Sequence, residues 1–422
     1  MPGSSSSSRA LPSPAYGWAV LLCVSLAQFG GYYLYDSLGM VADWVLVDHH
    51  LRESQYGLLS GTYGIAGALA LLVGGHSIDR LGTKRSILVF ALITTLAGIV
   101  TAITSGFWGL QLGRFLLGLG AEPLSIAVST TLARYWKGRA VAFAFGLNLT
   151  LCRLGTVAAN RSPQWAASAY ASGTSAVPLR LAALIGCVCL LAAICNYWVE
   201  QRAERRFDLP VIGTTDKLTV SEIRSFDHRY WLLVGVCVAF YAIVFPFQSF
   251  ATKLLMEGHG VARDQAGAVL SYLPASAMIA APLFGALVDR VGRRAQLLFL
   301  GLLLSLPVFP LLAISGVSPT GPILLLCVSF SLIPAVLWPS VSLVVPEKRL
   351  ATAYSLMTLL QQLAVWALSA ALGFINEASL ASEQHPAGYA PGMWLLAGLA
   401  AIGVLCGFLL LVRKQQGSGA GL

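Results

Sequence analysis

Charged residues are scarce in this chain. Only 11% of its 422 residues are Asp, Glu, Lys or Arg, while 57% are hydrophobic. An average soluble domain carries about 25% charged residues. The chain therefore has too few polar side chains to cover a globular surface of its size. This composition excludes an ordinary soluble domain and favours a membrane protein.

The residue groupings that support enzymatic chemistry are also missing. The six His residues are scattered, the eight Cys residues lie in apolar segments without metal-ligand spacing, and no phosphate-binding loop or paired nucleophile and base is evident. We therefore expect no enzyme activity, no cofactor and no bound metal. The net charge of +9 is spread over many loops and forms no dense basic patch, which argues against a nucleic-acid partner.

Long apolar runs fill most of the chain. Each has about the 20 residues with which a helix crosses the hydrocarbon core of a bilayer, and a helix satisfies its own backbone hydrogen bonds there. We predict an all-α integral membrane protein with twelve transmembrane helices. The predicted helices cover residues 17–39, 55–76, 86–105, 107–131, 140–160, 178–199, 230–252, 265–288, 295–315, 320–345, 351–375 and 391–412.

One long hydrophilic connector divides these helices into two sets of six. The predicted organisation is a polar tail, a six-helix bundle, the connector, a second six-helix bundle and a short tail, at residues 1–16, 17–199, 200–229, 230–412 and 413–422. An even number of spans places both termini on one side. Most of the 27 Lys and Arg residues fall on that side, so the positive-inside rule predicts cytoplasmic termini.

A short charged loop occurs twice, half a chain length apart. Residues 75–84 and 285–294 share the pattern Gly-x-x-x-Asp-Arg-x-Gly-x-base. Each copy lies between two long apolar runs. An internal repeat of half the chain is typical of transporters built from two related halves.

The doubled loop, the two sets of six spans and the central connector resemble the major facilitator superfamily. Residues 114–120 resemble that superfamily's second motif, whereas the Gly-Pro motif of its antiporters is absent from the fifth span. The resemblance implies two pseudo-symmetric six-helix bundles and a loop network that latches them together on the cytoplasmic side. The residues expected to gate in this way are Asp79, Arg80, Gly82, Asp289, Arg290 and Gly292. The alternative is a turn that only keeps basic residues in the cytoplasm.

Four charged residues stand out inside the predicted spans: Asp36, Arg114, Glu122 and Arg153. A charge at the bilayer centre costs about 2.5–3.5 kcal/mol on insertion scales, so each needs a partner or a function. All four belong to polar stripes at helical spacing, which face protein or water rather than lipid. Arg114 belongs to the superfamily motif and we interpret it as structural. For Asp36, a cation ligand, a proton site and a hydrogen-bond partner for Tyr all remain open.

The second half contributes aromatic and amide groups instead of charges. The superfamily resemblance places spans 1, 4, 7 and 10 around a central cavity, with the polar faces of spans 5 and 11 nearby. The candidate substrate-binding residues are Tyr35, Asp36, Glu122, Arg153, Tyr241, Phe245, Gln248, Trp338 and Gln361.

Glu122 and Arg153 together suit a zwitterion. Arg binds a carboxylate through a two-pronged contact and Glu accepts an ammonium group. Two extended residues span about 7 Å, so a dipeptide could reach both groups on neighbouring helices. The alternative is that Glu122 and Arg153 pair with each other and only join two helices.

Several further blocks resemble one branch of the superfamily, the lysosomal dipeptide transporters. They include residues 113–124, 145–155, 201–205, 244–247, 337–339 and 344–347. This resemblance implies a uniporter that moves dipeptides, including those with cationic side chains, through the lysosomal membrane. It carries over Glu122 and Arg153 as peptide contacts. It also implies, for animal members, a glycosylated single-span accessory subunit as partner.

The chain departs from that branch at two points. Pro123 stands where a small hydroxyl residue is expected, and the N-terminal tail has no acidic dileucine sorting signal. A plasma membrane or bacterial inner membrane therefore remains an alternative location. Two other functions also remain open: proton-coupled transport of a different small solute through Asp36 or Glu122, and a receptor or scaffold that transports nothing.

Overall fold

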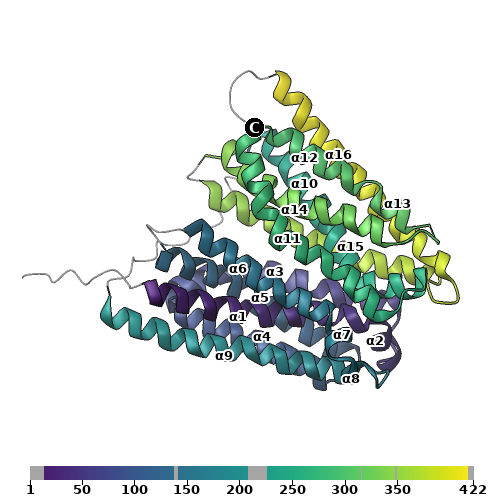
Figure 1. The fold of residues 1–422 in the computed structure, drawn as a ribbon, viewed down its shortest axis with the longest axis horizontal. Helices are drawn as coiled ribbons and strands as arrows, with labels where there is room; N and C mark the ends of the chain where they lie inside the picture. The colour runs from purple at the N-terminus through teal and green to yellow at the C-terminus, as the bar shows by residue number, and fades with distance from the viewer. Residues whose placement is uncertain (1–13, 137–140, 208–225, 315, 347–348, 417–422) are drawn as a thin grey trace, which may run out of the picture.

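The computed structural model describes residues 14–136, 141–207, 226–314, 316–346 and 349–416, and these residues fold into an array of long helices (Figure 1). The first half consists of six long helices and four short elements, two after the first long helix and two after the fifth. They are α1 (Pro14–Ser37), η1 (Gly39–Val41), α2 (Ala42–Asp48), α3 (Glu53–Leu81), α4 (Thr83–Ile103), α5 (Phe107–Trp136), α6 (Val141–Asn160), α7 (Ser162–Trp165), α8 (Ala167–Tyr170) and α9 (Ala176–Arg206).

The second half repeats this arrangement, with one of its six spans broken in two. Its elements are α10 (His228–Lys253), the π-helical turn η3 (Leu254–Gly258), α11 (Arg263–Val291), α12 (Arg294–Ser305), α13 (Val308–Leu312), α14 (Thr320–Val344), α15 (Leu350–Ala378), η5 (Pro386–Tyr389) and α16 (Ala390–Gln416). The predicted span 295–315 is the broken one, because Pro307 cannot donate the helical hydrogen bond at the junction of α12 and α13. The prediction of an all-α membrane protein in two six-helix bundles is confirmed.

Nine helices of the described residues are long and apolar enough to cross a membrane. The three long helices outside that set are α3, α6 and α11, with 29, 20 and 29 residues. Even the shortest of them reaches about 30 Å, the thickness of the hydrocarbon core. All three pack against helices of the opposite half, α3 against α15 and α6 against α11.

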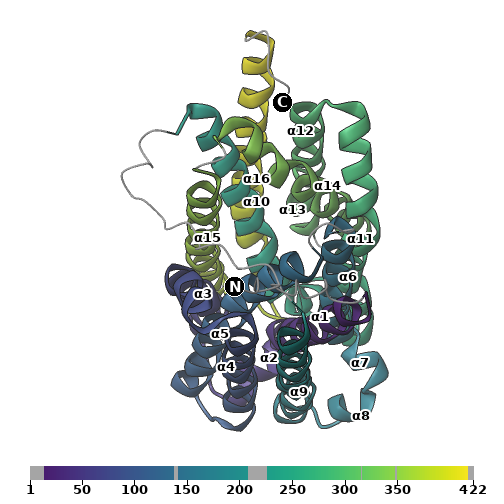
Figure 2. The same cartoon turned by 90° about the vertical axis from the view of Figure 1, so that its left-hand side faces the viewer.

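Two ends of the molecule are distinguished below. The terminal end is where α1 begins and α16 ends; the distal end is where α1 ends and α2, α7 and α8 lie (Figure 1). Figure 2 looks at the molecule from the terminal end and shows α3 beneath α15 and α6 beneath α11, where the two halves meet. The region between these two contacts holds the site.

The connector is shorter than the predicted 200–229. It begins later because α9 continues to Arg206, and it ends earlier because α10 begins at His228. The extension carries Glu200 and Glu204, whose carboxylates bind side chains of α4 and α5. These contacts join the end of α9 to α4 and α5.

Candidate functional site

A cavity of about 270 Å³ lies between the two halves. This volume is near the lower end of the range for small-molecule sites. Helices α1, α3, α5 and α6 line it from the first half, and α10, α14 and α15 from the second. The predicted substrate-binding residues that line it are Tyr35, Asp36, Glu122, Arg153, Phe245, Gln248, Trp338 and Gln361.

Tyr241 is the one predicted residue outside this lining. Its hydroxyl oxygen accepts a hydrogen bond from Trp338 Nε1 at 2.9 Å, and its ring stacks on Phe245 with the centroids 5.7 Å apart. Tyr354 on α15 donates to the backbone oxygen of Trp338 at 3.0 Å. Tyr241 therefore supports an aromatic wall of the cavity from behind.

Glu122 receives one hydrogen bond from each half of the molecule. Its Oε1 accepts from the hydroxyl of Tyr63 on α3 at 2.9 Å and from Nε2 of Gln362 on α15 at 2.9 Å. No basic side chain of the described residues lies within ion-pair distance of it. The carboxylate is thus oriented by neutral donors, and its second oxygen accepts no bond from the described side chains.

Arg153 lines the same cavity as Asp36, but no acidic side chain of the part of the chain that the structure describes lies within ion-pair distance of it. Its guanidinium lies over the rings of Tyr32 and Phe330, 5.2 and 5.5 Å from their centroids. Its Nε is buried and makes no hydrogen bond with the described residues. The ion pair between Glu122 and Arg153, which the sequence left open, is not formed in this structure. An unpaired guanidinium held by aromatic rings is suited to bind an anionic group.

Arg114 has a different environment. It is 3% exposed, donates from Nη1 to the backbone oxygen of Tyr35 at 3.0 Å, and lies over the Tyr35 ring. It does not line the cavity. These contacts fix the part of α1 that carries Tyr35 and Asp36, in agreement with the structural interpretation of Arg114.

Sequence reasoning missed Tyr63 and the contact of Gln362 with Glu122. Tyr63 lies on α3, a helix that was not expected to line the cavity. The signal was a stripe of glycines on that helix: Gly57, Gly61, Gly64 and Gly67. A Cβ at Gly64 would lie 2.8 Å from the backbone oxygen of Gln362. Such a stripe indicates a close approach of two helices, and here it brings α15 onto α3.

The two glycines of the repeated loop have the backbone conformation that a tight turn requires. Gly82 joins α3 to α4 at φ 75° and Gly292 ends α11 at φ 64°, in the region that favours glycine. Arg80 and Arg290 are exposed. The side chains of Asp79 and Asp289 lie outside the described residues, so the latch stays a prediction.

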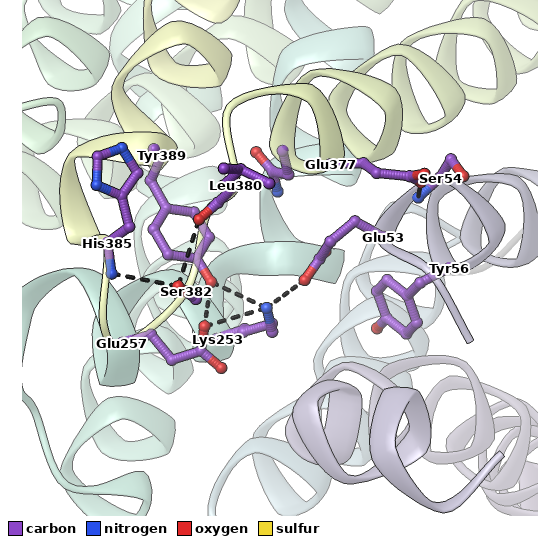
Figure 3. Close-up of polar contacts among 12 residues, drawn as sticks. Glu53, Ser54, Tyr56, Lys253, Glu257, Glu377, Leu380, Ser382, His385 and Tyr389 are labelled. Atoms are coloured by element: carbon purple, nitrogen blue, oxygen red, sulfur yellow. Dashed lines mark hydrogen bonds and ion pairs between the residues drawn. The ribbon is translucent and has the colours of Figure 1, made fainter. Parts of the chain in front are cut away.

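Polar contacts between the halves gather at the distal end. Lys253 on α10 donates to Glu53 of α3, and also lies 3.1 Å from Glu257 and 3.0 Å from the Tyr389 hydroxyl (Figure 3). The Glu377 carboxylate accepts a bond from the Ser54 backbone N–H at 3.0 Å.

A second distal contact joins α2 to α11. Arg263 makes two hydrogen bonds to the Asp43 carboxylate, at 2.9 and 2.5 Å, and its guanidinium lies 3.8 Å from the centroid of the Trp44 ring. Such two-pronged, ring-stacked pairs are among the stronger ionic contacts in proteins. The distal end is therefore held closed in this structure.

Comparison with known proteins identifies the class. The model of the Major Facilitator Superfamily matches residues 21–370. The chain belongs to this superfamily, as the doubled loop and the fold indicate.

Within this superfamily, the chain is similar to one group of transporters. The chain is 30% identical over 368 residues to the lysosomal dipeptide transporter MFSD1 of Danio rerio, covering 84% of this chain and 80% of the relative. It is 29% identical over 372 residues to the human MFSD1, covering 86% and 80%. The relatives are named as transporters, which agrees with the expectation that this protein is not an enzyme.

Solved structures share the fold at low identity. A bacterial homologue of the human lysosomal transporter Spinster aligns with a TM-score of 0.76 at 17% identity, over 96% of this chain and 98% of that chain. The POT family transporter PepTSo aligns with a TM-score of 0.74 at 13% identity, over 96% and 98%. These similarities support the fold alone.

Proposed function

We propose that this protein moves dipeptides across a membrane by alternating access, as a uniporter. The observation that carries the proposal is the charge pattern of the cavity. Among the described residues, no carboxylate lies within ion-pair distance of the Arg153 guanidinium, and no basic side chain lies within that distance of the Glu122 carboxylate. A zwitterion supplies both missing partners at once.

The remaining lining fits a peptide of variable sequence. Trp338, Phe245 and Tyr35 provide aromatic surfaces, and Gln248 and Gln361 provide amide groups on the same cavity. Amide groups can bond the peptide linkage, and aromatic faces accept apolar or cationic side chains without demanding one residue. The similarity to MFSD1 from two vertebrates supports the same substrate class.

The proposed location follows from the same relatives. We place the protein in a lysosomal membrane, with the terminal end on the cytoplasmic side because most basic loop residues belong to that end. The plasma membrane and a bacterial inner membrane are the alternatives.

A ligand panel tests the substrate class. Purified protein is heated with a dipeptide, with its N-acetylated and C-amidated forms, with free amino acids and with sugars. A ligand at 100 times its Kd stabilises the folded state by about 2.7 kcal/mol. The unmodified dipeptide is expected to raise the melting temperature, and each blocked form to do so less. Equal shifts from blocked and unblocked peptides would exclude recognition of both charges.

A proton-coupled carrier is the second candidate, because Asp36 and Glu122 both line the cavity and neither forms an ion pair with another described residue. Uptake into proteoliposomes with and without an imposed pH gradient separates the two. A uniporter equilibrates its substrate without the gradient, whereas a proton-coupled carrier concentrates it when the gradient is present.

A further inference from the structure

One hydrogen bond joins the two halves at the cavity itself. It runs from Gln362 of α15 to Glu122 of α5, at 2.9 Å, and the Gln362 side chain is buried. The other side-chain hydrogen bonds between the halves, among the described residues, connect elements at or near the distal end. Among these contacts between the halves, the bond from Gln362 is therefore the one that involves a candidate substrate-binding residue, Glu122.

The approach of α15 to α3 makes this bond possible. A Cβ at Gly67 would lie 2.8 Å from Cγ of Glu122. Because Gly67 has no side chain, the Glu122 side chain can pass over this position of α3 and contact Gln362. The same helix pair continues to the distal end, where a Cβ at Gly57 would lie 2.9 Å from Cα of Gly373. One tightly packed seam thus connects the cavity to the distal contacts.

Opening the distal end would separate the partners of Glu122. Tyr63 belongs to the same half as Glu122 and would stay with it. Gln362 belongs to the other half and would leave with α15. A buried carboxylate that loses a donor is destabilised, and a cation replaces a neutral amide favourably because charge-assisted bonds are stronger.

We propose that Gln362 is a positioning residue that couples the occupancy of Glu122 to closure of the distal end. The inference rests on the proposed function. In the empty carrier the Gln362 amide satisfies Glu122 and stabilises the closed distal end. The substrate's ammonium group takes over the Glu122 carboxylate, the cross-half bond weakens, and distal opening becomes easier. By linkage, distal opening raises the affinity for the ammonium group to the same extent.

The distance between the halves at the distal end is the direct measurement. Ser172 and Gln384 are exposed residues in distal loops, one in each half. Spin labels can be attached there through p-acetylphenylalanine, so the eight native Cys residues stay unchanged. Double electron–electron resonance in nanodiscs then measures the distance between the labels, and its distribution gives the populations with the distal end closed and open. Gln362→Leu is expected to raise the ratio of open to closed populations about tenfold. The matched control is Gln361→Leu, because Gln361 also lines the cavity but accepts a hydrogen bond from Cys237 rather than contacting Glu122.

Exchange of the two side chains tests the contact itself. The double variant Glu122→Gln/Gln362→Glu keeps one amide and one carboxylate in the pair and is expected to restore the closed population. Gln362→Glu alone places two carboxylates in contact, so the distal end is expected to open at neutral pH and to close as acidification lets the pair share a proton. A merely structural role for Gln362 would give neither the rescue nor the pH dependence.

The ligand arm separates this inference from the proposed function. A dipeptide is expected to lengthen the distal distance in the native protein, its N-acetylated form to leave it unchanged, and Gln362→Leu to show no further change with dipeptide. If the dipeptide raises the melting temperature but Gln362→Leu leaves the populations unchanged, or Gln361→Leu matches its effect, the coupling is wrong while the substrate assignment survives. If no dipeptide raises the melting temperature, the proposed function fails instead.

Discussion

The two ends of the molecule use charged residues in opposite ways. At the distal end, Lys253 with Glu53 and Arg263 with Asp43 join one half to the other. At the terminal end, Lys84 and Arg134 bind Glu204 within the first half. The distal pairs can form only when the two halves are close together at that end. The terminal pairs lie within the first half, so they stay formed when the halves move relative to each other.

Burial reinforces this difference. Glu200 at the terminal end is fully buried and accepts bonds from Thr83 Oγ1 and Asn196 Nδ2, both at 2.6 Å. A carboxylate satisfied inside one bundle stabilises the fold of that bundle. A carboxylate satisfied across the two bundles stabilises one conformation of the carrier. The distal network therefore acts on the conformational balance, and the terminal network on stability.

The largest effect is expected at Lys253. Lys253→Met leaves the Glu53 side chain, which is only 12% exposed, without its cationic partner. Breaking a buried pair costs about 3–5 kcal/mol. Because Glu53 belongs to the other half, the cost falls on the closed distal end, and the distal spin-label distance is expected to lengthen. Lys253→Met/Glu53→Gln removes both charges and should recover much of the closed population. A single variant with the native distance distribution would show that the pair does not hold the ends together.

Gly57 tests the packing of the same end. A Cβ there would lie 2.5 Å from the backbone oxygen of Ser369, which cannot swing away. Gly57→Ala is expected to disfavour distal closure by about 1–3 kcal/mol, as overpacking usually does. The control is Gly398→Ala on α16, where the added Cβ meets nothing within 4 Å. Equal uptake rates and equal distances for both variants would contradict the role of the α3–α15 seam.

Glu200 provides the contrast at the terminal end. Glu200→Gln keeps the shape of the side chain but removes its charge, and is expected to lower the free energy of unfolding by about 1–2 kcal/mol. Its distal distance distribution should match that of the native protein, because all partners of Glu200 lie in the first half. A lengthened distal distance in this variant would erase the distinction between the two networks.

The smallest effect is expected at the repeated loop. Asp79→Asn should express and insert normally, because one loop charge at a helix end contributes only about 0.3–1 kcal/mol. If the loop latches the halves in the conformation opposite to the one described, the variant transports slowly. Uptake at the native rate would refute the latch and leave a turn that only orients the chain in the membrane.

The sequence predicted the helices because long apolar runs in a bilayer have few alternatives to a helix. It also predicted most of the cavity lining, since polar residues such as Asp36 and Arg153 recur at helical spacing and avoid lipid. Membership of the superfamily supplied the arrangement of those faces around one centre.

Such patterns could not predict contacts between residues that are far apart in the sequence. Lys253 and Glu53 are 200 residues apart, and Gln362 and Glu122 are 240 residues apart. Nothing in the local spacing of either residue indicates its partner. The glycines of α3 indicated that another helix packs closely against α3, but not which helix. The position of Tyr63 and the hydrogen bond from Gln362 to Glu122 therefore became clear only from the three-dimensional arrangement.

Uptake of a radiolabelled dipeptide into proteoliposomes tests the central claim most directly. The native protein is expected to equilibrate the dipeptide without a pH gradient, and Arg153→Gln to lose most of this uptake because the peptide carboxylate loses its guanidinium. N-acetylated and C-amidated peptides should compete poorly. Absence of dipeptide uptake by the folded native protein, or equal uptake by Arg153→Gln, would contradict recognition of a zwitterion by the unpaired charges of the cavity.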